Sequence, residues 1–423
     1  MYKILLTLFS LSAFLTFSPT VHALDGTWRL IQFRKWAMFH FCSISFSDPR
    51  NGWIGGTKLY RTRDGGVTWE EIIGDPSDPE VRDVVFIDDN KGWIAAGRNG
   101  LLVTEDGGSS WQRISGEMPE GSVNSVFFIN ETSGWVIMST GSFDNLVLAT
   151  RDAGRTFTDV TPPELAEGNI FLDSLFHHPD FAKNWLVMTV DPSFQGVRNV
   201  YRPRLFFINE NEGWLNTAAG LLFTENGGEG WRVVREGCIL DFTALDRNTV
   251  IALAEDADNG RVLSVSIDGG ESFTDIPAPG KRFYNIYFLD ANLGWAATVR
   301  GIYHTVDGGN TWQLQYTIDP EPHRQLVGFT IEWQDPRNPF FYEMFFNADS
   351  TGYAVGAGNA FYMFTPAPLG DLNNNGVLDI FDLLEFLRIL RQEPSQRIST
   401  ADLNSDGVVD VSDLTELLRL LGK

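Results

Sequence analysis

Oxygen-bearing side chains recur at fixed spacing in two short segments near the C-terminus, thirty-one residues apart. The two segments carry them at matching places: Asp371, Asn373, Asn375, Asp379 and Asp382 in the first, and Asp402, Asn404, Asp406, Asp410 and Asp413 in the second. Carboxylate and amide oxygens are the ligands of hard cations, and Ca²⁺ takes six to eight of them. The segments therefore predict two bound calcium ions.

The spacing within each segment follows the twelve-residue calcium loop of the EF-hand. The side-chain ligands fall at positions 1, 3, 5, 9 and 12, and a glycine, Gly376 or Gly407, makes the sharp turn at position 6. Position 7 would add a backbone carbonyl, from Val377 or Val408, and position 9 would act through water. Because the first loop has three carboxylates and the second has four, we expect the first to bind calcium more weakly.

Each loop is followed by leucines at helical spacing, and no helical pattern precedes it. The expected apolar faces consist of Leu383, Leu387 and Leu390 in the first helix, and of Leu414, Leu418 and Leu421 in the second. A duplicated loop and helix with aspartate at position 12 resembles the type I dockerin, and the resemblance covers 371–423. It implies a small α-helical, EF-hand-like module that binds a cohesin domain on a scaffold or cell surface. In that family, the residues at positions 10 and 11 of each loop select the partner. Here they are Ile380 and Phe381 in the first loop and Val411 and Ser412 in the second, so the two loops do not match.

A second repeated phrase occupies most of the chain before this module. It has the form Thr-x-Asp-Gly-Gly-x-Thr-Trp, with variations, and occurs at 62–69, 104–111, 150–157, 224–231, 266–273 and 305–312. Asp-Gly-Gly between apolar runs predicts a hairpin, and the carboxylate can accept hydrogen bonds from the amides of the turn. At 224–231 the acid is replaced by Asn226, which keeps the acceptor oxygen and loses the charge. This replacement indicates a structural role, with the aromatic ring that ends each phrase buried in the sheet interface.

Gly-Trp pairs, as at Gly92-Trp93 and Gly294-Trp295, follow short apolar runs and precede most of these phrases. Each unit of about forty residues then reads as four short antiparallel strands, which is the blade of a β-propeller. The last unit lacks the phrase, and residues 25–30 copy its ending, so the N-terminal strand should complete the last blade. We predict a mainly β fold with seven blades. Residues 160–203 are either an insertion between blades, which we favour, or a degenerate eighth blade.

The repeated phrase resembles the Asp-box, or bacterial neuraminidase repeat, of sialidases and related propellers. Over about 25–365 the wording is closer to propellers of the photosystem II assembly and stability factor type. That resemblance implies a non-catalytic domain that binds a protein or a glycan. The alternative is a glycoside hydrolase acting in polysaccharide catabolism, in which two carboxylates at the top of the blades act as acid and base. The sequence identifies no catalytic residues for that alternative.

The N-terminus has the features of a secretory signal. Lys3 is followed by an apolar stretch over 4–17 and by small residues that end at Ala23, so we expect cleavage after Ala23 and a secreted or cell-surface protein. The propeller then covers 24–364, a Pro-rich linker covers 365–370, and the dockerin-like module covers 371–423. No other segment is apolar over the length needed to span a membrane.

The formal net charge is −23, from 55 acidic and 32 basic residues. Without a concentrated run of lysine and arginine, the chain is not expected to bind nucleic acid. Cys42 and Cys238 could form one disulfide in an oxidising compartment, but both border apolar strands, so two buried free thiols are favoured.

Overall fold

The structure is a computed structural model. It describes residues 26–31, 41–56, 58–73, 81–140, 145–166, 203–217, 219–255, 260–278, 283–298, 301–317, 341–347, 350–356, 361–373, 377–394, 397, 401–404 and 408–422. The chain divides into two compact units, one of which is Asp25–Pro366 and the other of which contains Ala367–Lys423. The expected signal peptide lies outside the described residues.

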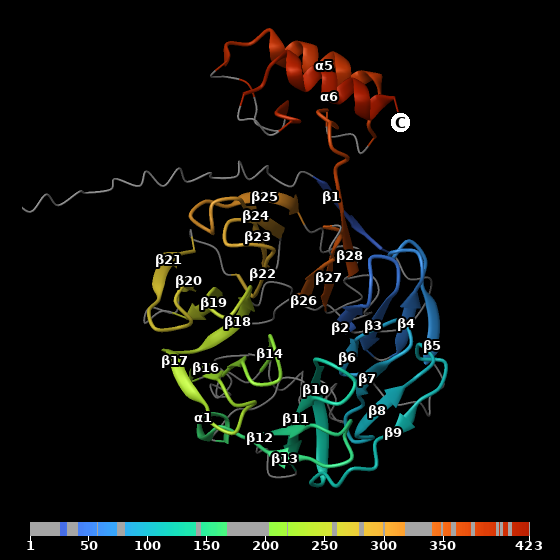
Figure 1. Ribbon diagram of the computed structural model, residues 1–423, viewed down its shortest axis with the longest axis vertical. Coiled ribbons are helices and arrows are strands. Elements are labelled where there is room, and N and C mark those ends of the chain that lie inside the picture. Colours follow the sequence, from blue (N-terminus) through green and yellow to red (C-terminus); the bar gives the residue numbers. More distant parts are fainter. Residues whose placement is uncertain are drawn as a thin grey trace, which may run out of the picture. The chain divides into compact units, whose positions relative to one another are not determined.

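Seven four-stranded antiparallel sheets make up the first unit and stand in a ring (Figure 1). The first blade contains β2 (Phe41–Phe46), β3 (Gly52–Gly56), β4 (Leu59–Thr62) and β5 (Glu70–Ile73). The second contains β6 (Asp83–Phe86), β7 (Gly92–Ala95), β8 (Leu101–Thr104) and β9 (Gln112–Arg113). The third contains β10 (Gly121–Phe128), β11 (Gly134–Thr140), β12 (Asn145–Thr150) and β13 (Thr158–Asp159).

The next three blades repeat this order. They are β14 (Leu205–Phe207), β15 (Gly213–Asn216), β16 (Gly220–Thr224) and β17 (Arg232–Glu236); β18 (Ile239–Ala244), β19 (Val250–Glu255), β20 (Arg261–Ser266) and β21 (Thr274–Pro277); and β22 (Asn285–Phe288), β23 (Gly294–Thr298), β24 (Gly301–Thr305) and β25 (Gln313–Thr317). In each blade the first strand lies innermost and the fourth lies outermost (Figure 1).

The seventh blade joins the two ends of the propeller. It consists of β26 (Phe341–Phe346), β27 (Gly352–Gly356), β28 (Phe361–Pro366) and β1 (Gly26–Leu30). Strand β1 runs antiparallel to β28, from the pair Gly26 and Pro366 to the pair Leu30 and Tyr362. The prediction that the N-terminal strand completes the last blade is confirmed.

The described residues form seven blades, as the sequence predicted. The segment 160–203, which the sequence left open as an insertion or an eighth blade, lies between the third and fourth blades. Its described part contains only a one-turn helix, α1 (Pro163–Ala166), and residues 167–202 lie outside the described residues.

The blades hold together through stacked aromatic rings. Trp93, on the second strand of one blade, stacks on Phe128, on the first strand of the next, with ring centroids 3.9 Å apart. Four other blade interfaces repeat this stack: Trp53 on Phe86, Trp135 on Phe207, Trp295 on Phe346, and Tyr353 on Phe46. These are the rings of the Gly-Trp phrase, and all five are almost fully buried. The rings of the Asp-boxes are only half-buried, at the edges of the same clusters.

Close packing explains why the first residue of the Gly-Trp pair is a glycine. A Cβ atom added at Gly92 would lie 2.5 Å from the ring of Phe86 on the neighbouring strand, and one added at Gly52 would lie 2.4 Å from Phe46. No side chain fits at that distance. The pair therefore lets one ring cover the backbone of its own blade while the tryptophan extends to the next.

The described residues of the second unit contain two helices, α5 (Ile380–Leu390) and α6 (Val411–Leu421). Each begins with a reciprocal capping box, Asp379 with Asp382 in α5 and Asp410 with Asp413 in α6, which satisfies free amides of the first turn. The small core is made by Leu372, Phe386, Ile389, Ala401, Leu403 and Leu417.

The prediction of which residues form the apolar faces of the two helices is partly wrong. Leu387 is 38% exposed and Leu418 is 51% exposed, whereas Phe386 and Leu417 are fully buried. The aspartate at position 12 of each loop sets the phase of its helix, because its side chain turns inward and the residue four places later then faces the core. The other four predicted leucines pack at the border of the core.

Cys42 and Cys238 form no disulfide, and Cys42 is buried while Cys238 is half-buried. Burial raises the pKa of the Cys238 thiol to about 11, so it is not a reactive thiolate. Within the described residues, no helix has the length and apolar character needed to cross a membrane.

Candidate functional site

The first calcium loop is closed by the carboxylate at its twelfth position. One oxygen of Asp382 accepts hydrogen bonds from the amides of Leu372 (2.9 Å) and Asn373 (3.2 Å), and the other accepts from the amide of Asp379 (2.8 Å). The side chain of Asp382 is fully buried. Position 12 therefore lies beside positions 2, 3 and 9, so the two ends of the loop meet, as binding of a single cation requires.

The second loop repeats these contacts at the same positions. Asp413 accepts from the amides of Leu403 (2.7 Å), Asn404 (3.1 Å) and Asp410 (2.9 Å), and it too is fully buried. The residues at position 1, Asp371 and Asp402, are also buried, with 6% and 4% of their surface exposed.

Two buried carboxylates in each loop fit a divalent cation. A buried anion is costly unless an opposite charge compensates it, and calcium binding would supply that charge. Position 5 of each loop, Asn375 and Asp406, lies outside the described residues, as do the glycines at position 6. Among the residues that the structure does describe, no group of three acidic, histidine or cysteine side chains is close enough to hold a metal by itself.

Apolar side chains at the start of each helix are exposed. Ile380 and Phe381 are 57% and 61% exposed, and Leu384, one turn further along, is 57% exposed. In the second repeat Val411 is 66% exposed, but its neighbour is Ser412, whose hydroxyl donates to Asp410 and accepts from the side-chain amide of Asn404. The four residues predicted to select a partner are thus all at the surface, and the first pair is the more apolar.

The Asp-boxes are turns that hold themselves together. In the first box, Asp64 accepts from the amide of Thr68 (2.8 Å), from its hydroxyl (2.6 Å) and from the hydroxyl of Thr62 (2.9 Å). The hydroxyl of Thr62 in turn accepts from the amide of Gly66 (2.8 Å). Asn226 makes the corresponding contacts with Gly230 (2.8 Å) and Thr224 (2.9 Å). These contacts occupy the carboxylates, as a structural role requires.

The same hydrogen bonds lower the pKa values of the box aspartates. The hydroxyl and then the amide of Ser110 hold the pKa of Asp106 at about 2, and those of Ser272 do the same for Asp268. A carboxyl with so low a pKa stays ionised at any physiological pH and cannot act as a general acid.

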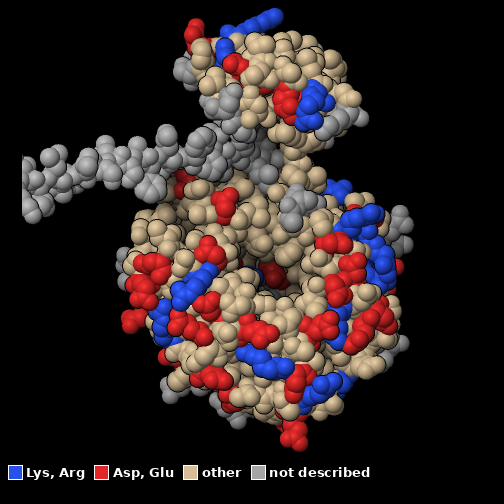
Figure 2. Space-filling view, in the orientation of Figure 1, with Lys and Arg blue, Asp and Glu red and all other residues tan. Residues whose placement is uncertain are grey.

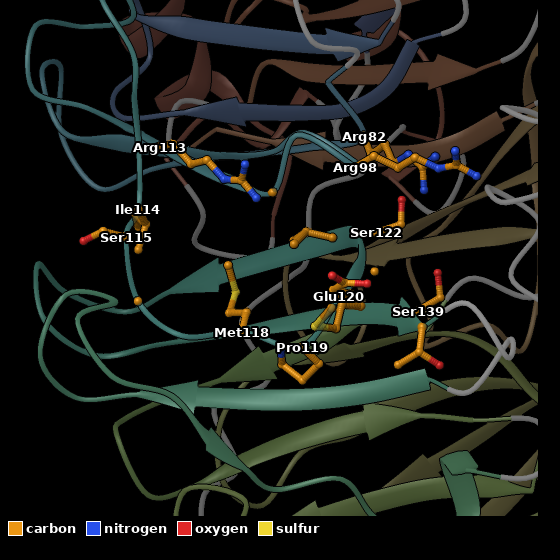
Figure 3. Close-up of a pocket in the computed structure, with 16 residues that line it drawn as sticks. Arg82, Arg98, Arg113, Ile114, Ser115, Met118, Pro119, Glu120, Ser122 and Ser139 are labelled. Atoms are coloured by element: carbon orange, nitrogen blue, oxygen red, sulfur yellow. The ribbon is translucent and has the colours of Figure 1, made fainter.

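A cavity of about 1010 Å³ lies between the second and third blades (Figure 3). Its lining includes three arginines from the second blade, Arg82, Arg98 and Arg113. The sequence analysis did not single them out, because they lie on three separate strand ends and form no run.

A ring of polar residues surrounds the centre of the propeller, where Figure 2 shows an opening with acidic side chains inside it. On the first strand of each blade, one residue pairs with the tryptophan of the Gly-Trp phrase or with the residue that replaces it. The residue two places before that one is polar in all seven blades. The seven are Ser43, Asp83, Ser125, Arg204, Asp241, Asn285 and Glu343. The signal for this ring in the sequence is the polar residue directly before each apolar run, and it was missed.

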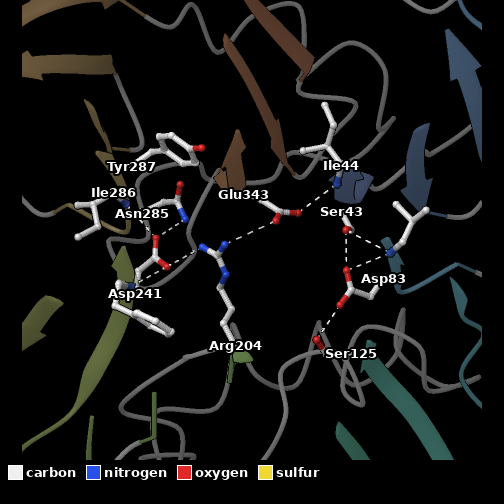
Figure 4. A network of polar contacts seen from close by, with 12 residues as sticks. Ser43, Ile44, Asp83, Ser125, Arg204, Asp241, Asn285, Ile286, Tyr287 and Glu343 are labelled. Carbon is white, nitrogen blue, oxygen red and sulfur yellow. Dashed lines mark hydrogen bonds and ion pairs between the residues drawn. The ribbon is translucent and has the colours of Figure 1, made fainter. Parts of the chain in front are cut away.

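Members of this ring join neighbouring blades (Figure 4). Asp83 accepts from the hydroxyls of Ser43 and Ser125, both at 2.6 Å, and so links the first three blades. On the other side, Asp241 accepts from a guanidinium nitrogen of Arg204 at 2.9 Å and from the side-chain amide of Asn285 at 2.5 Å.

Two carboxylates flank the guanidinium of Arg204. Besides Asp241, an oxygen of Glu343 lies 3.8 Å from its second terminal nitrogen. Glycoside hydrolases use a pair of carboxylates on either side of the substrate, and a pair that shares one guanidinium is the candidate here. Asp241, however, is 2% exposed and also accepts from the amides of Ile286 and Phe242. Burial raises its pKa, and Arg204 acts in the opposite direction.

Asp241 has the environment of a structural carboxyl group. Four donors surround it and almost none of its surface is open, so no substrate proton can reach it. The neighbouring Tyr287 is similarly unsuited to attack a substrate, because burial raises the pKa of its phenol and its hydroxyl donates to the carbonyl of Phe346.

Family models match two separate parts of the chain. Residues 71–168 match the family model of the photosynthesis system II assembly factor YCF48. Residues 369–422 match the type I dockerin domain. Type I dockerin domains bind calcium, and their presence implies a cohesin partner. No curated protein sequence matches the chain.

Solved structures match the propeller over most of its length. YCF48 bound to D1 peptide is 22% identical, with a TM-score of 0.55, and the match covers 81% of this chain and 98% of that one. YCF48 from Cyanidioschyzon merolae is 19% identical, with a TM-score of 0.53, covering 80% and 98%. An ancestral GH74 enzyme, AFV00434, is 13% identical, with a TM-score of 0.54, covering 80% of this chain but 47% of the enzyme. At these identities the likeness establishes the fold alone.

Proposed function

We propose that this chain is a secreted binding protein. Its propeller holds a protein or glycan ligand without catalysis, and its C-terminal module tethers it to a cohesin domain in a calcium-dependent way. The observation that carries the proposal is the closure of both loops by Asp382 and Asp413, with a buried acid at position 1 of each. Two calcium ions would be held by the oxygen ligands at positions 1, 3, 5, 7 and 12, with position 9 acting through water.

The docking surface of the module is proposed to be asymmetric. Ile380, Phe381 and Leu384 form a continuous exposed apolar face along the first turns of α5. Exposed apolar patches of this kind favour protein contacts, because burying them removes apolar surface from water. In α6 the equivalent of Phe381 is Ser412, whose hydroxyl is already hydrogen-bonded. We therefore infer that α5 makes the main contact with the cohesin.

A binding role for the propeller is favoured over hydrolysis. The aspartates of the Asp-boxes are occupied by their own turns, and the carboxylate pair around Arg204 has one member that substrate cannot reach. A glycoside hydrolase would need both of its carboxylates open to substrate. A screen of the full chain on a panel of polysaccharides tests this: release of reducing sugar would favour the hydrolase.

The tether is tested by calorimetry and capture with the full chain. We expect two calcium ions to bind, and capture on immobilised cohesin domains to require calcium and to be lost with chelator. Replacing Asp402 and Asp413 by alanine should abolish capture and most calcium binding. The same changes at Asp371 and Asp382 should reduce calcium binding less, since the first loop has fewer carboxylates.

A matched control is Glu131→Ala, which removes an exposed carboxylate of the propeller and should leave capture unchanged. The asymmetry is tested by Ile380→Asp with Phe381→Asp, which should weaken capture more than Val411→Asp with Ser412→Asp. Capture that persists in chelator would contradict the tether, and equal losses in the two double variants would contradict the asymmetry alone.

A further inference from the structure

The cavity between the second and third blades gathers positive charge in a strongly acidic protein. The net charge of the chain is −23, yet three arginines line this one cavity. Most other arginines that the structure describes in the propeller pair with a carboxylate, as Arg232 does with Glu271 and Arg235 does with Asp275. The exposed side chains of Arg98 and Arg113 form no hydrogen bond or ion pair with any residue that the structure describes.

The second blade places these arginines at the ends of its strands. Arg82 directly precedes β6, Arg98 lies in the turn between β7 and β8, and Arg113 ends β9. Since the strands are antiparallel, these positions lie at the same end of the sheet, opposite the Asp-box turn. Figure 3 shows Arg113 at one end of the cavity, and Arg82 and Arg98 at the other.

Two glycines let the guanidinium groups lie against the backbone. A Cβ atom added at Gly97 would lie 3.0 Å from Nε of Arg82, and one added at Gly100 would lie 3.2 Å from Nε of Arg113. Both glycines have positive φ, at 56° and 86°, where other residues are strained. Arg82 is also held by Asn124, to whose side-chain oxygen it donates, and it is only 7% exposed. Two of the three arginines thus lie against a glycine, and Arg82 is also anchored by a hydrogen bond.

The opposite wall of the cavity belongs to the third blade and has a different character (Figure 3). It offers the hydroxyls of Ser122 and Ser139, the exposed carboxylate of Glu120, and the apolar surface of the half-buried Met118. Hydroxyl and carboxylate groups accept hydrogen bonds from ligand hydroxyls, and the thioether side chain suits the C–H surface of a sugar ring.

We propose that this cavity binds an acidic oligosaccharide, with uronate carboxylates on the arginines and sugar hydroxyls on the opposite wall. Guanidinium groups bind carboxylates in a forked, charge-assisted manner. Because the arginines lie at both ends of the cavity, a ligand that repeats a carboxylate along its length fits better than a single small anion. An acidic peptide would satisfy the arginines but would leave the hydroxyl-rich wall and Glu120 without partners.

This inference rests on the proposed binding role of the propeller, and it names the class of ligand. It is tested with the full chain by calorimetry, using tetragalacturonate as the probe. Its methyl ester has the same skeleton without the charges, and it should bind at least tenfold more weakly. Arg98→Gln with Arg113→Gln should weaken binding of the acid at least tenfold, since both side chains are exposed and their loss should not impair folding. Arg50→Gln, at an exposed arginine in the turn after β2, should leave it unchanged.

Several outcomes would overturn the inference. No binding of tetragalacturonate, equal binding of the methyl ester, or binding unaffected by the double variant would each do so. Tighter binding of tetraglutamate would assign the cavity to a peptide instead. Binding of a neutral glycan or a peptide elsewhere on the propeller would leave the proposed binding role intact while this inference fails. The melting temperature of each variant separates a binding defect from a folding defect.

Discussion

Replacing Trp28 by alanine should open the seventh blade. Trp28 lies on the N-terminal strand β1 and is only 5% exposed. Its ring packs on Phe364 of β28, with centroids 5.3 Å apart, and meets Phe346 of β26 edge-on at 6.0 Å. Its indole N–H donates to the side chain of Gln315 on β25, in the sixth blade, at 2.9 Å. One side chain therefore attaches the first strand of the chain to two blades.

The cost of this substitution follows from the burial. Truncating a buried tryptophan to alanine costs about 3–5 kcal/mol, through lost transfer free energy and the cavity left behind. The free energy of unfolding of a domain is about 5–15 kcal/mol, so the loss is a large fraction of the total. Trp28→Phe keeps a ring against Phe364 and loses mainly the hydrogen bond to Gln315, which contributes about 1 kcal/mol.

Urea unfolding followed by tryptophan fluorescence measures the effect. All thirteen tryptophans precede residue 366, so the signal reports the propeller and not the C-terminal module. We expect the urea midpoint of unfolding to be highest for the wild type, lower for Trp28→Phe and lowest for Trp28→Ala. Deletion of Gly26–Leu30 should lower the midpoint at least as much as Trp28→Ala. A Trp28→Ala variant whose unfolding free energy stays within about 0.5 kcal/mol of wild type, the usual range for surface substitutions, would refute the closure argument.

Three further predictions concern the acids of the propeller. Asp64→Ala should lower the unfolding free energy by about 1–3 kcal/mol, since it leaves turn amides unpaired, and calorimetry should find ligand affinity unchanged in the folded protein. Asp241→Ala should cost about 3–5 kcal/mol in urea unfolding, because it leaves Arg204 without its buried partner; a cost below 1 kcal/mol would contradict that role. The pKa values of Asp106 and Asp268 are about 2 in the folded protein, below the ordinary 3.8, so their stabilisation is complete above about pH 5 and is lost as the pH falls towards 2. Melting temperature should fall over that window, and less steeply in the double variant with asparagine at both positions; equal slopes would contradict the assignment.

The blade architecture could be predicted because short sequence motifs meet its local structural requirements. The Asp-box needs an acceptor oxygen and two residues of positive φ within one turn, which are glycines in every box except at Ala153, and the Gly-Trp pair needs a bare backbone beside a ring. Even the fifth blade, where Val250 and Ile251 replace the Gly-Trp pair, was recognisable by its Asp-box at 266–273. The closure by β1 was predictable for the same reason, since 25–30 copy the end of the repeated phrase.

The polar ring and the cavity were not predictable in the same way. Ser43, Arg204 and Glu343 occupy equivalent places in their blades but share no residue type, so no repeated phrase marks them. What they share is a position near the axis, which depends on closure of the whole ring. The arginines of the cavity similarly come together only when three strand ends of one sheet meet the neighbouring blade. The phase of the dockerin-like helices was missed because buried aspartates, rather than leucines, set it.

The position of β28 also determines how the propeller would carry a mechanical load. The chain leaves the propeller at Pro366, the last residue of β28, and continues towards the C-terminal module. Strand β28 is not an edge strand, since β1 pairs along one side of it and β27 along the other. A pull on the tether along this strand would load both ladders of hydrogen bonds in shear, so that they resist together instead of opening one after another. If the protein is anchored by its C-terminus in a flowing medium, the load would fall on a strand that is hydrogen-bonded on both sides. One of its two partners is the N-terminal strand.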